Sequence, residues 1–253
     1  MSSTNQQLQD QLVETANSVA HSGVLSLSGH GNISIRIPGR DEMLYTAGPS
    51  LRDFPAASVA RLALDGTVLE GEVPPMAAAV VAMHTLIYQE RPETGCVLHT
   101  HAPFATAFAV ANRPIEGWTE AFGIFGLEDG VPLAAYGARG SAQALQNIKR
   151  VLTPKTQAVL LANHGVLCFH STPALAAQVN VIVEEAAQAA IYAGAIGGAR
   201  AVPPELLHTS QARAASFEAA GKYFSCRSAI VTSEARPLWN DSWTVDHHFS
   251  STS

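Results

Sequence analysis

Residues 96–101 read CVLHTH, an apolar run that ends in two histidines separated by one residue. A short apolar segment of this kind, bounded by helical patterns, predicts a buried strand. On a strand, residues i and i+2 point to the same face, so His99 and His101 should present two imidazoles from one rigid element. That arrangement favours a metal site, although two polar residues that simply close a strand would give the same tripeptide.

Residues 160–165 read LLANHG, a second apolar run that ends in a histidine followed by glycine. The pattern predicts another buried strand and places His164 at the turn after it. A third imidazole from a separate strand would complete a set of three histidines. Such a set leaves coordination positions open for water or substrate, as at a catalytic metal. Only the fold can bring His164 to His99 and His101, because nothing sequential links them.

The rest of the chain mixes strand and helix patterns without strict βαβ alternation. Residues 32–37 alternate polar and apolar and predict a strand, and Asp65-Gly66 between two apolar runs predicts a hairpin. Helical spacing appears over about 8–20, 76–90, 102–111, 141–152 and from 173 onward. This mixture favours a layered α/β sandwich. No repeat or low-complexity linker is visible, so we expect one domain over 1–253, with 222–253 as a C-terminal extension.

Composition limits the partners of the 253-residue chain. Its formal net charge is −6 and it has no basic run, which argues against nucleic acid. No stretch reaches the roughly 18 uncharged apolar residues of a membrane helix, since Glu184 and Glu185 interrupt the longest candidate. With 42 alanines and only 14% charged residues, polar surface is scarce, which predicts a homo-oligomer. Three cysteines without a CxxC pair, and a polar N-terminus, indicate a reducing, cytoplasmic setting.

Four segments together resemble the class II aldolase/adducin family. They are residues 31–36 (GNISIR), 83–92 (MHTLIYQERP), 97–107 (VLHTHAPFATA) and 161–166 (LANHGV). Their order and spacing fit the family over about Leu8 to Gly221. The resemblance implies a three-layer α/β/α sandwich around a central, mainly antiparallel sheet of about nine strands. It also implies a homotetramer with active sites at subunit interfaces.

The resemblance further implies one divalent metal per subunit, bound by His99, His101 and His164. Zinc is the first expectation, with manganese or iron as alternatives. In this family the metal polarises a carbonyl or holds an enediolate, so the partner of the protein is a small-molecule substrate.

Two departures from the family's pattern bear on that substrate. The sugar-phosphate members carry two serines and an acid ahead of the helix histidine, where this chain has Ala78, Ala79 and Val80. Their phosphate-binding loop is also altered, to TAGP over residues 46–49. We therefore expect a substrate without a phosphate group, and what replaces the missing acid at Val80 is open.

The resemblance assigns further positions in the site. Asn32, Thr46 and Gly48 match substrate-binding segments of the family. Glu120 falls near a catalytic tyrosine, among aromatic residues; partial burial there would raise the pKa of its carboxyl group and suit it to acid–base work. An exposed loop glutamate is the alternative. His30, in a glycine-rich turn, is either an acid–base or anion-binding group or a turn residue.

These residues predict a metal-dependent carbon–carbon lyase, of aldolase or decarboxylase type, acting on a small unphosphorylated carbonyl or carboxylate compound. The absence of an acid at position 80, where this chain has Val80, favours decarboxylation, because decarboxylation needs one fewer proton abstraction than aldol cleavage. Two alternatives stay open: a mononuclear iron oxygenase on the same fold, and a non-catalytic adducin-like interaction module. Adducin-type domains lose the metal histidines, whereas this chain retains them.

Overall fold

The computed structural model describes residues 3–219, which form strands and helices in mixed order. The strands are β1 Gly31–Arg36, β2 Glu42–Thr46, β3 Val59–Ala63, β4 Val68–Glu70, β5 Cys96–Thr100, β6 Leu133–Ala134, β7 Ala158–Leu161 and β8 Gly165–His170. The α-helices are α1 Ser3–His21, α2 Pro75–Glu90, α3 Pro103–Val110, α4 Glu120–Ile124, α5 Ala142–Val151, α6 Pro173–Ala193 and α7 Pro204–Ala219. Short 3-10 helices lie at Ala56–Ser58 and Gly194–Ile196.

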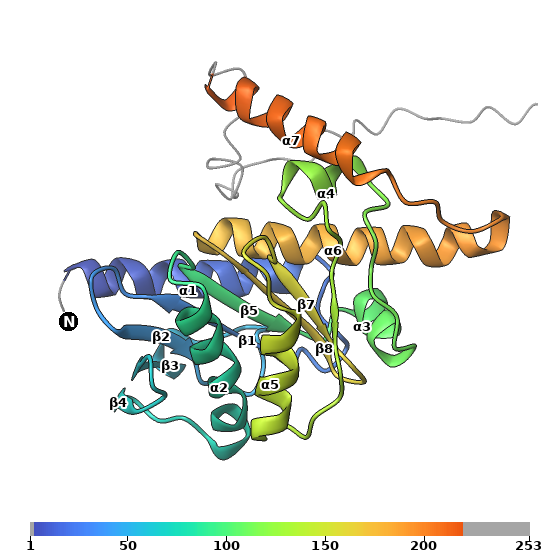
Figure 1. Ribbon diagram of the computed structural model, residues 1–253. Coiled ribbons are helices and arrows are strands. Elements are labelled where there is room, and N and C mark those ends of the chain that lie inside the picture. Colours follow the sequence, from blue (N-terminus) through green and yellow to red (C-terminus); the bar gives the residue numbers. More distant parts are fainter. Residues whose placement is uncertain (1–2, 220–253) are drawn as a thin grey trace, which may run out of the picture. The chain divides into compact units, whose positions relative to one another are not determined.

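The strands form one mixed sheet in the order β4-β3-β2-β1-β5-β8-β7-β6 (Figure 1). All neighbouring pairs are antiparallel except β6 and β7. The described residues thus confirm the predicted three-layer α/β/α sandwich with a mainly antiparallel sheet. They contain eight strands, where the family resemblance implied about nine. The predicted extension, 222–253, lies outside the described residues.

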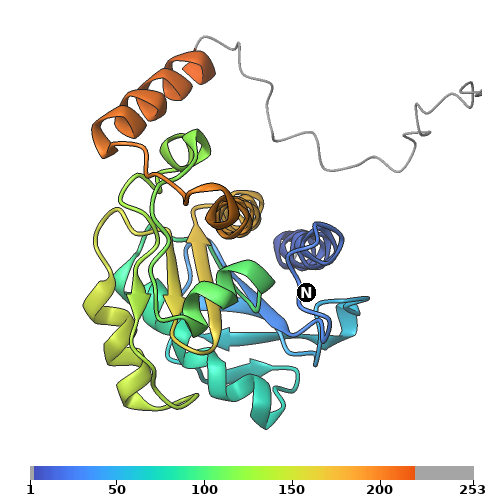
Figure 2. The same ribbon diagram turned by 90° about the vertical axis from the view of Figure 1, so that its right-hand side faces the viewer.

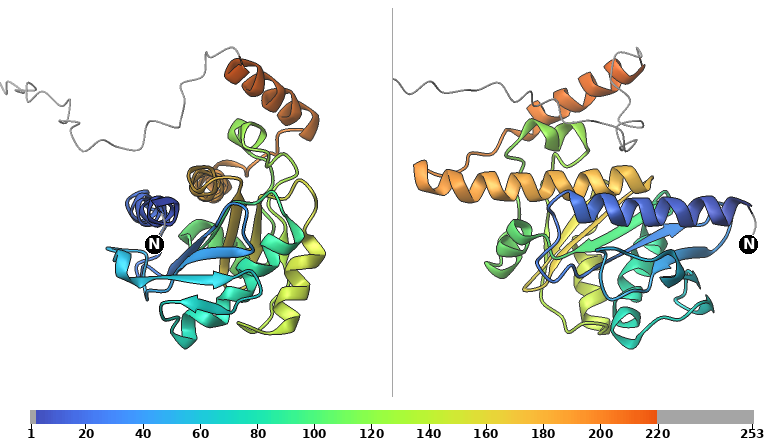
Figure 3. Two further views of the ribbon diagram at one scale, coloured as in Figure 1. Left: turned by 90° about the vertical axis from the view of Figure 1, so that its left-hand side faces the viewer. Right: turned by 180° about the vertical axis from the view of Figure 1, so that it is seen from behind.

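Helices cover both faces of the sheet because its central strands are apolar on both sides. Leu98 of β5 packs in a core with α1, α3 and α6, whereas its neighbour Val97 packs with α2 and α5. Figures 2 and 3 show α1 and α6 side by side on one face. His99 shares the strand parity of Val97, so β5 directs this histidine to the α2 and α5 side.

The start of α3 is fixed directly after His101. The buried carboxylate of Glu184, on α6, accepts the backbone N–H groups of Phe104 and Ala105, each over 2.8 Å. A carboxylate at a helix N-terminus satisfies otherwise unpaired donors and interacts favourably with the helix dipole. The contact therefore anchors the chain just beyond the end of β5.

Among the described helices, none combines the length and apolar character that crossing a bilayer requires.

Candidate metal centre

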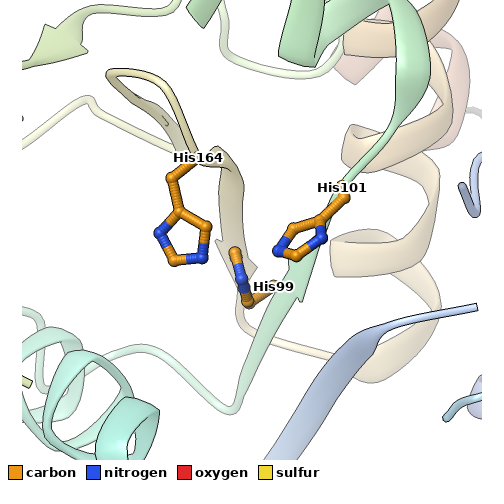
Figure 4. Close-up of side chains that lie close together, drawn as sticks. All are labelled: His99, His101 and His164. Carbon is orange, nitrogen blue, oxygen red and sulfur yellow. The ribbon is translucent and has the colours of Figure 1, made fainter. Parts of the chain in front are cut away.

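Three imidazoles from two separate parts of the sequence converge beside the end of β5 and the turn between β7 and β8 (Figure 4). His99 lies on β5, His101 directly follows that strand, and His164 lies in the turn between β7 and β8. One ring nitrogen from each lies within 4.8 Å of the others, and the ring centroids are 4.7 to 5.1 Å apart. The structure thus brings together the three histidines that the sequence singled out.

The ring nitrogens of the three histidines differ in their hydrogen bonds. His99 donates its Nδ1 hydrogen to the carbonyl oxygen of Val166 over 3.0 Å, which leaves the lone pair on Nε2. The Nε2 atoms of His101 and His164 are buried and have no hydrogen-bond partner. Buried polar atoms are almost always paired, so this arrangement calls for an additional ligand. A divalent cation fits three convergent imidazole nitrogens of this kind.

Burial keeps these imidazoles in the neutral form that binds metal. It holds the pKa of His99 well below its usual range, with repulsion from His164 and His101 adding to the effect. It also lowers the pKa of His164 to about 4, helped by His101 and Arg139. The pKa of His101 is lowered as well, first by burial and then by Arg139 and His30. Neutral imidazoles carry the free lone pairs that metal coordination needs.

The backbone on either side of His164 explains why an Asn-His-Gly sequence stands there. Asn163 has a φ of +57°, in the left-handed region that asparagine tolerates better than most residues. Its N–H donates to the carbonyl oxygen of Ala109 on α3. At Gly165, an added Cβ would lie 2.5 Å from the carbonyl oxygen of Thr100 and 2.9 Å from His101 Cδ2. Glycine is therefore required for the turn to approach the other two histidines.

A second hydrogen-bonded group lies next to the cluster. Asn32, on β1, pairs directly with His99 in the β1–β5 register and so shares its face of the sheet. The fully buried His84 of α2 donates its Nε2 hydrogen to Asn32 Oδ1 over 2.7 Å and accepts from the Ser34 hydroxyl over 2.8 Å. Burial lowers the pKa of His84 to about 3, so this ring is neutral. It orients Asn32, whose Nδ2 group has no described protein partner.

The other sequence-predicted residues lie at different distances from the cluster. His30 is exposed, with its ring centroid 6.3 Å from that of His101, and so lies at the rim. Glu120 begins α4 and accepts a hydrogen bond from the Ser210 hydroxyl of α7 over 3.3 Å. Of the two alternatives, partial burial is wrong for the single chain, because Glu120 is exposed at the start of α4. No described contact joins Glu120 to the three histidines, and its catalytic role stays a prediction.

Thr46 and Gly48 have local structural roles. The Thr46 hydroxyl is buried, accepts from the backbone N–H of Ile33 and donates to its carbonyl oxygen. A Cβ at Gly48 would lie 2.9 Å from the ring of Phe54. Both residues shape the loop that follows β2. Their assignment to substrate binding stays a prediction.

The first turns of α2 contribute no acid to the cluster. Val80 is buried in the core on the α2 face of the sheet, and the sole carboxylate of this helix is Glu90 at its last position. The position that carries an acid in sugar-phosphate members of the family is therefore an apolar packing position here.

Sequence reasoning missed Arg139. This residue lies in the loop between β6 and α5 and lines one small pocket together with His164. The sequence did contain a signal, because Arg139 is the sole charged residue between Asp129 and Lys149. Solvent-exposed loops and helices usually carry several charged residues, so a single arginine in residues 130–148 stands out.

The fold and the three-histidine cluster define an α/β protein of the class II aldolase type, and sequence comparison agrees. Residues 10–191 match the class II aldolase and adducin N-terminal domain, and the chain belongs to that family. The family resemblance noted in the sequence is thus confirmed.

Individual relatives give a more detailed comparison. A 5-methylthioribulose-1-phosphate/5-deoxyribulose-1-phosphate aldolase of Rhodospirillum rubrum is 29% identical over 177 residues, which cover 70% of this chain and 77% of the relative. A 3-oxo-tetronate 4-phosphate decarboxylase of Haemophilus influenzae is 30% identical over 148 residues, covering 56% of this chain and 67% of the relative. The solved structure of an L-fuculose 1-phosphate aldolase has the same fold, with a TM-score of 0.72 at 23% identity over 84% of this chain and 97% of that one.

Proposed function

We propose that this chain is a divalent-metal-dependent carbon–carbon lyase that acts on a small carbonyl or carboxylate compound without a phosphate group. The proposal is supported chiefly by the three neutral imidazoles of His99, His101 and His164, which converge on one point. The buried Nε2 atoms of His101 and His164 have no protein partner. Zinc is the first candidate, with manganese or iron as alternatives. Bound there, the cation would act as a Lewis acid on a substrate carbonyl or carboxylate oxygen.

Residues of the chain would position the substrate and move protons. The Nδ2 hydrogens of Asn32, oriented through His84, are available to a substrate oxygen on the face of His99. His30 at the rim is exposed and near His101, so it can exchange protons with solvent and with a substrate group. Glu120 is the candidate acid or base from a neighbouring subunit. His30 and Glu120 would thus supply the proton transfer that a carboxylate at position 80 provides in sugar-phosphate members of the family.

The side chains at the start of α2 bear on whether the substrate carries a phosphate group. The named relatives are aldolases and a decarboxylase of phosphorylated sugars or sugar acids. In this chain the two serine positions of the sugar-phosphate enzymes are Ala78 and Ala79, which offer no hydroxyl to a phosphate group. Val80 provides no acid, which favours decarboxylation over aldol cleavage within the proposed class.

The proposal extends to the assembly and setting of the protein. We expect a cytoplasmic homotetramer with active sites at subunit interfaces, formed by a single domain with a C-terminal extension. Its partner would be a small molecule, with no part for nucleic acid or a membrane. The low charge content and the alanine-rich helices support burial of surface between subunits.

Turnover assays on metal-loaded protein test the proposed substrate class. L-fuculose 1-phosphate and L-ribulose 5-phosphate should give no turnover above the metal-free control. Small unphosphorylated 3-oxo acids and hydroxyketones should release carbon dioxide or an aldehyde. Robust turnover of either sugar phosphate would contradict the substrate class. Oxygen uptake by iron-loaded protein, without lyase activity, would instead indicate an oxygenase.

A further inference from the structure

The guanidinium of Arg139 has no assigned role in the site described above. Its side chain is exposed, and among the described residues it makes no hydrogen bond or ion pair. A guanidinium keeps its charge at every physiological pH and offers five N–H donors in a planar arrangement. Within the part of the chain that the structure describes, this cation is therefore available to a ligand.

The first half of the Arg139 loop is held rigidly against α5. Asn147 donates both amide hydrogens, to the carbonyl oxygens of Ala135 over 3.0 Å and of Tyr136 over 3.2 Å. Gly137 packs so closely on the helix that an added Cβ would lie 2.6 Å from Ala144 Cα. These contacts fix the path of the loop two residues before the arginine.

The second half of the loop is held against α2. Gly140 has a φ of +74°, and a Cβ there would lie 3.2 Å from the carbonyl oxygen of Ala79. The next residue, Ser141, caps α5 by accepting the backbone N–H of Ala144. Arg139 is thus anchored on both sides, beside the position where the sugar-phosphate enzymes carry serine.

The lining of one small pocket places Arg139 next to the three-histidine cluster. Arg139 and His164 line the same pocket, together with Met83 of α2. The same pocket is lined by Gly140, whose position against Ala79 fixes the loop on the α2 side. The charge therefore lies on the side of the cluster that faces α2 and the β6–α5 loop.

We propose that Arg139 is a specificity-determining residue that binds a carboxylate group of the substrate next to the three-histidine centre. A carboxylate matches the planar guanidinium with two parallel hydrogen bonds. A phosphate dianion needs further donors, and the start of α2, which contacts the loop through Ala79, has no hydroxyl at Ala78 or Ala79. The substrate class that follows is a small carboxylic acid that also carries a carbonyl or hydroxyl group.

This inference rests on the proposed function, and a matched pair of probes separates the two. Pyruvate and hydroxyacetone differ in that a carboxylate in the first is replaced by a neutral hydroxymethyl group in the second. Calorimetry on zinc-loaded protein measures the affinity of each probe, and elemental analysis measures the zinc content of every variant. Inorganic phosphate is the third probe, because it distinguishes a phosphate site from a carboxylate site. The variants are Arg139→Gln and Arg139→Lys, with Arg40→Gln as the control for loss of a distant exposed charge on the β1–β2 turn.

Wild-type protein should bind pyruvate more tightly than hydroxyacetone. Arg139→Gln should weaken pyruvate binding about tenfold or more, the range expected for a lost charge-assisted hydrogen bond, and leave zinc content unchanged. Arg139→Lys should recover part of the affinity, because it keeps the charge but loses the bidentate geometry. Arg40→Gln should match the wild type.

Several results would overturn the assignment of Arg139. Equal pyruvate affinity in wild type and Arg139→Gln at normal zinc content would do so, as would an absence of pyruvate binding to the zinc-loaded wild type. An Arg139-dependent site for phosphate but not for pyruvate would replace the carboxylate assignment. A wild-type protein that binds no divalent metal would instead contradict the proposed function itself.

Discussion

His99 donates its Nδ1 hydrogen to the carbonyl oxygen of Val166 over 3.0 Å, across the β5–β8 strand pair. A carbonyl oxygen can only accept, so this contact fixes the tautomer of His99 and leaves the lone pair on Nε2. Val166 directly follows the Asn-His-Gly turn that carries His164. The segment that supplies the third histidine therefore also orients the first, and a change in this turn should affect the whole cluster.

Gly165→Ala should disrupt the cluster. An added Cβ would lie 2.5 Å from the carbonyl oxygen of Thr100 and close to His101, so the turn or the ring must move. We expect a destabilisation of about 1–3 kcal/mol, as for other overpacked sites, and a clear loss of zinc affinity. Chemical denaturation and a competitive zinc titration measure the two effects.

Gly194→Ala is the matched control, since a Cβ at Gly194 meets nothing within 4 Å and its backbone is helical. It should be neutral or slightly stabilising. Wild-type zinc affinity in Gly165→Ala would show that the close approach of this turn does not position the histidines.

His84 should make the stability of the protein depend on pH. Burial lowers its pKa to about 3 from its usual value of 6.5, so between these values the unfolded chain binds a proton that the folded chain excludes. The stability contributed by this group is complete above pH 6.5 and is lost as the pH falls from 6.5 towards 3. His84→Gln keeps hydrogen-bonding groups but does not titrate. Its free energy of unfolding should therefore fall less steeply between pH 6.5 and 5, by at most about 1.4 kcal/mol per pH unit.

The comparison uses metal-free protein, so that release of metal at low pH adds nothing to the slope. His21→Gln, which removes an exposed histidine of α1, is the control. Equal slopes for wild type and His84→Gln would contradict the buried, neutral state of His84.

The three histidines could be predicted because each lies on a strand or directly beyond the end of one, where local patterns decide the direction of the chain. His99 and His101 share a face by their spacing of two, and the glycine after His164 marked a turn. Partial burial of Glu120 was wrong because aromatic residues that are neighbours in the sequence need not enclose a side chain at the start of a helix. Arg139 could not be placed, because its position depends on contacts of its loop with Asn147 of α5 and with Ala79 of α2, which no local pattern predicts.

Glu120 provides a test of the proposed shared active site. If it acts on the metal centre of a neighbouring subunit, His101→Ala and Glu120→Ala should each be inactive alone. Mixed oligomers of the two should recover activity, because some interfaces then contain both intact groups. Light scattering should give a tetramer at micromolar concentration. Inactive confirmed hybrids, or a monomeric mass, would contradict the shared site.

The central claim is that His99, His101 and His164 together bind one divalent metal ion, and elemental analysis of purified protein tests it most directly. Wild type and His170→Ala, which removes a histidine at the far end of β8, should each contain about one equivalent of metal per chain. His164→Ala should contain almost none after the same dialysis, with its folded state verified by circular dichroism. A full equivalent of metal in folded His164→Ala would contradict the account.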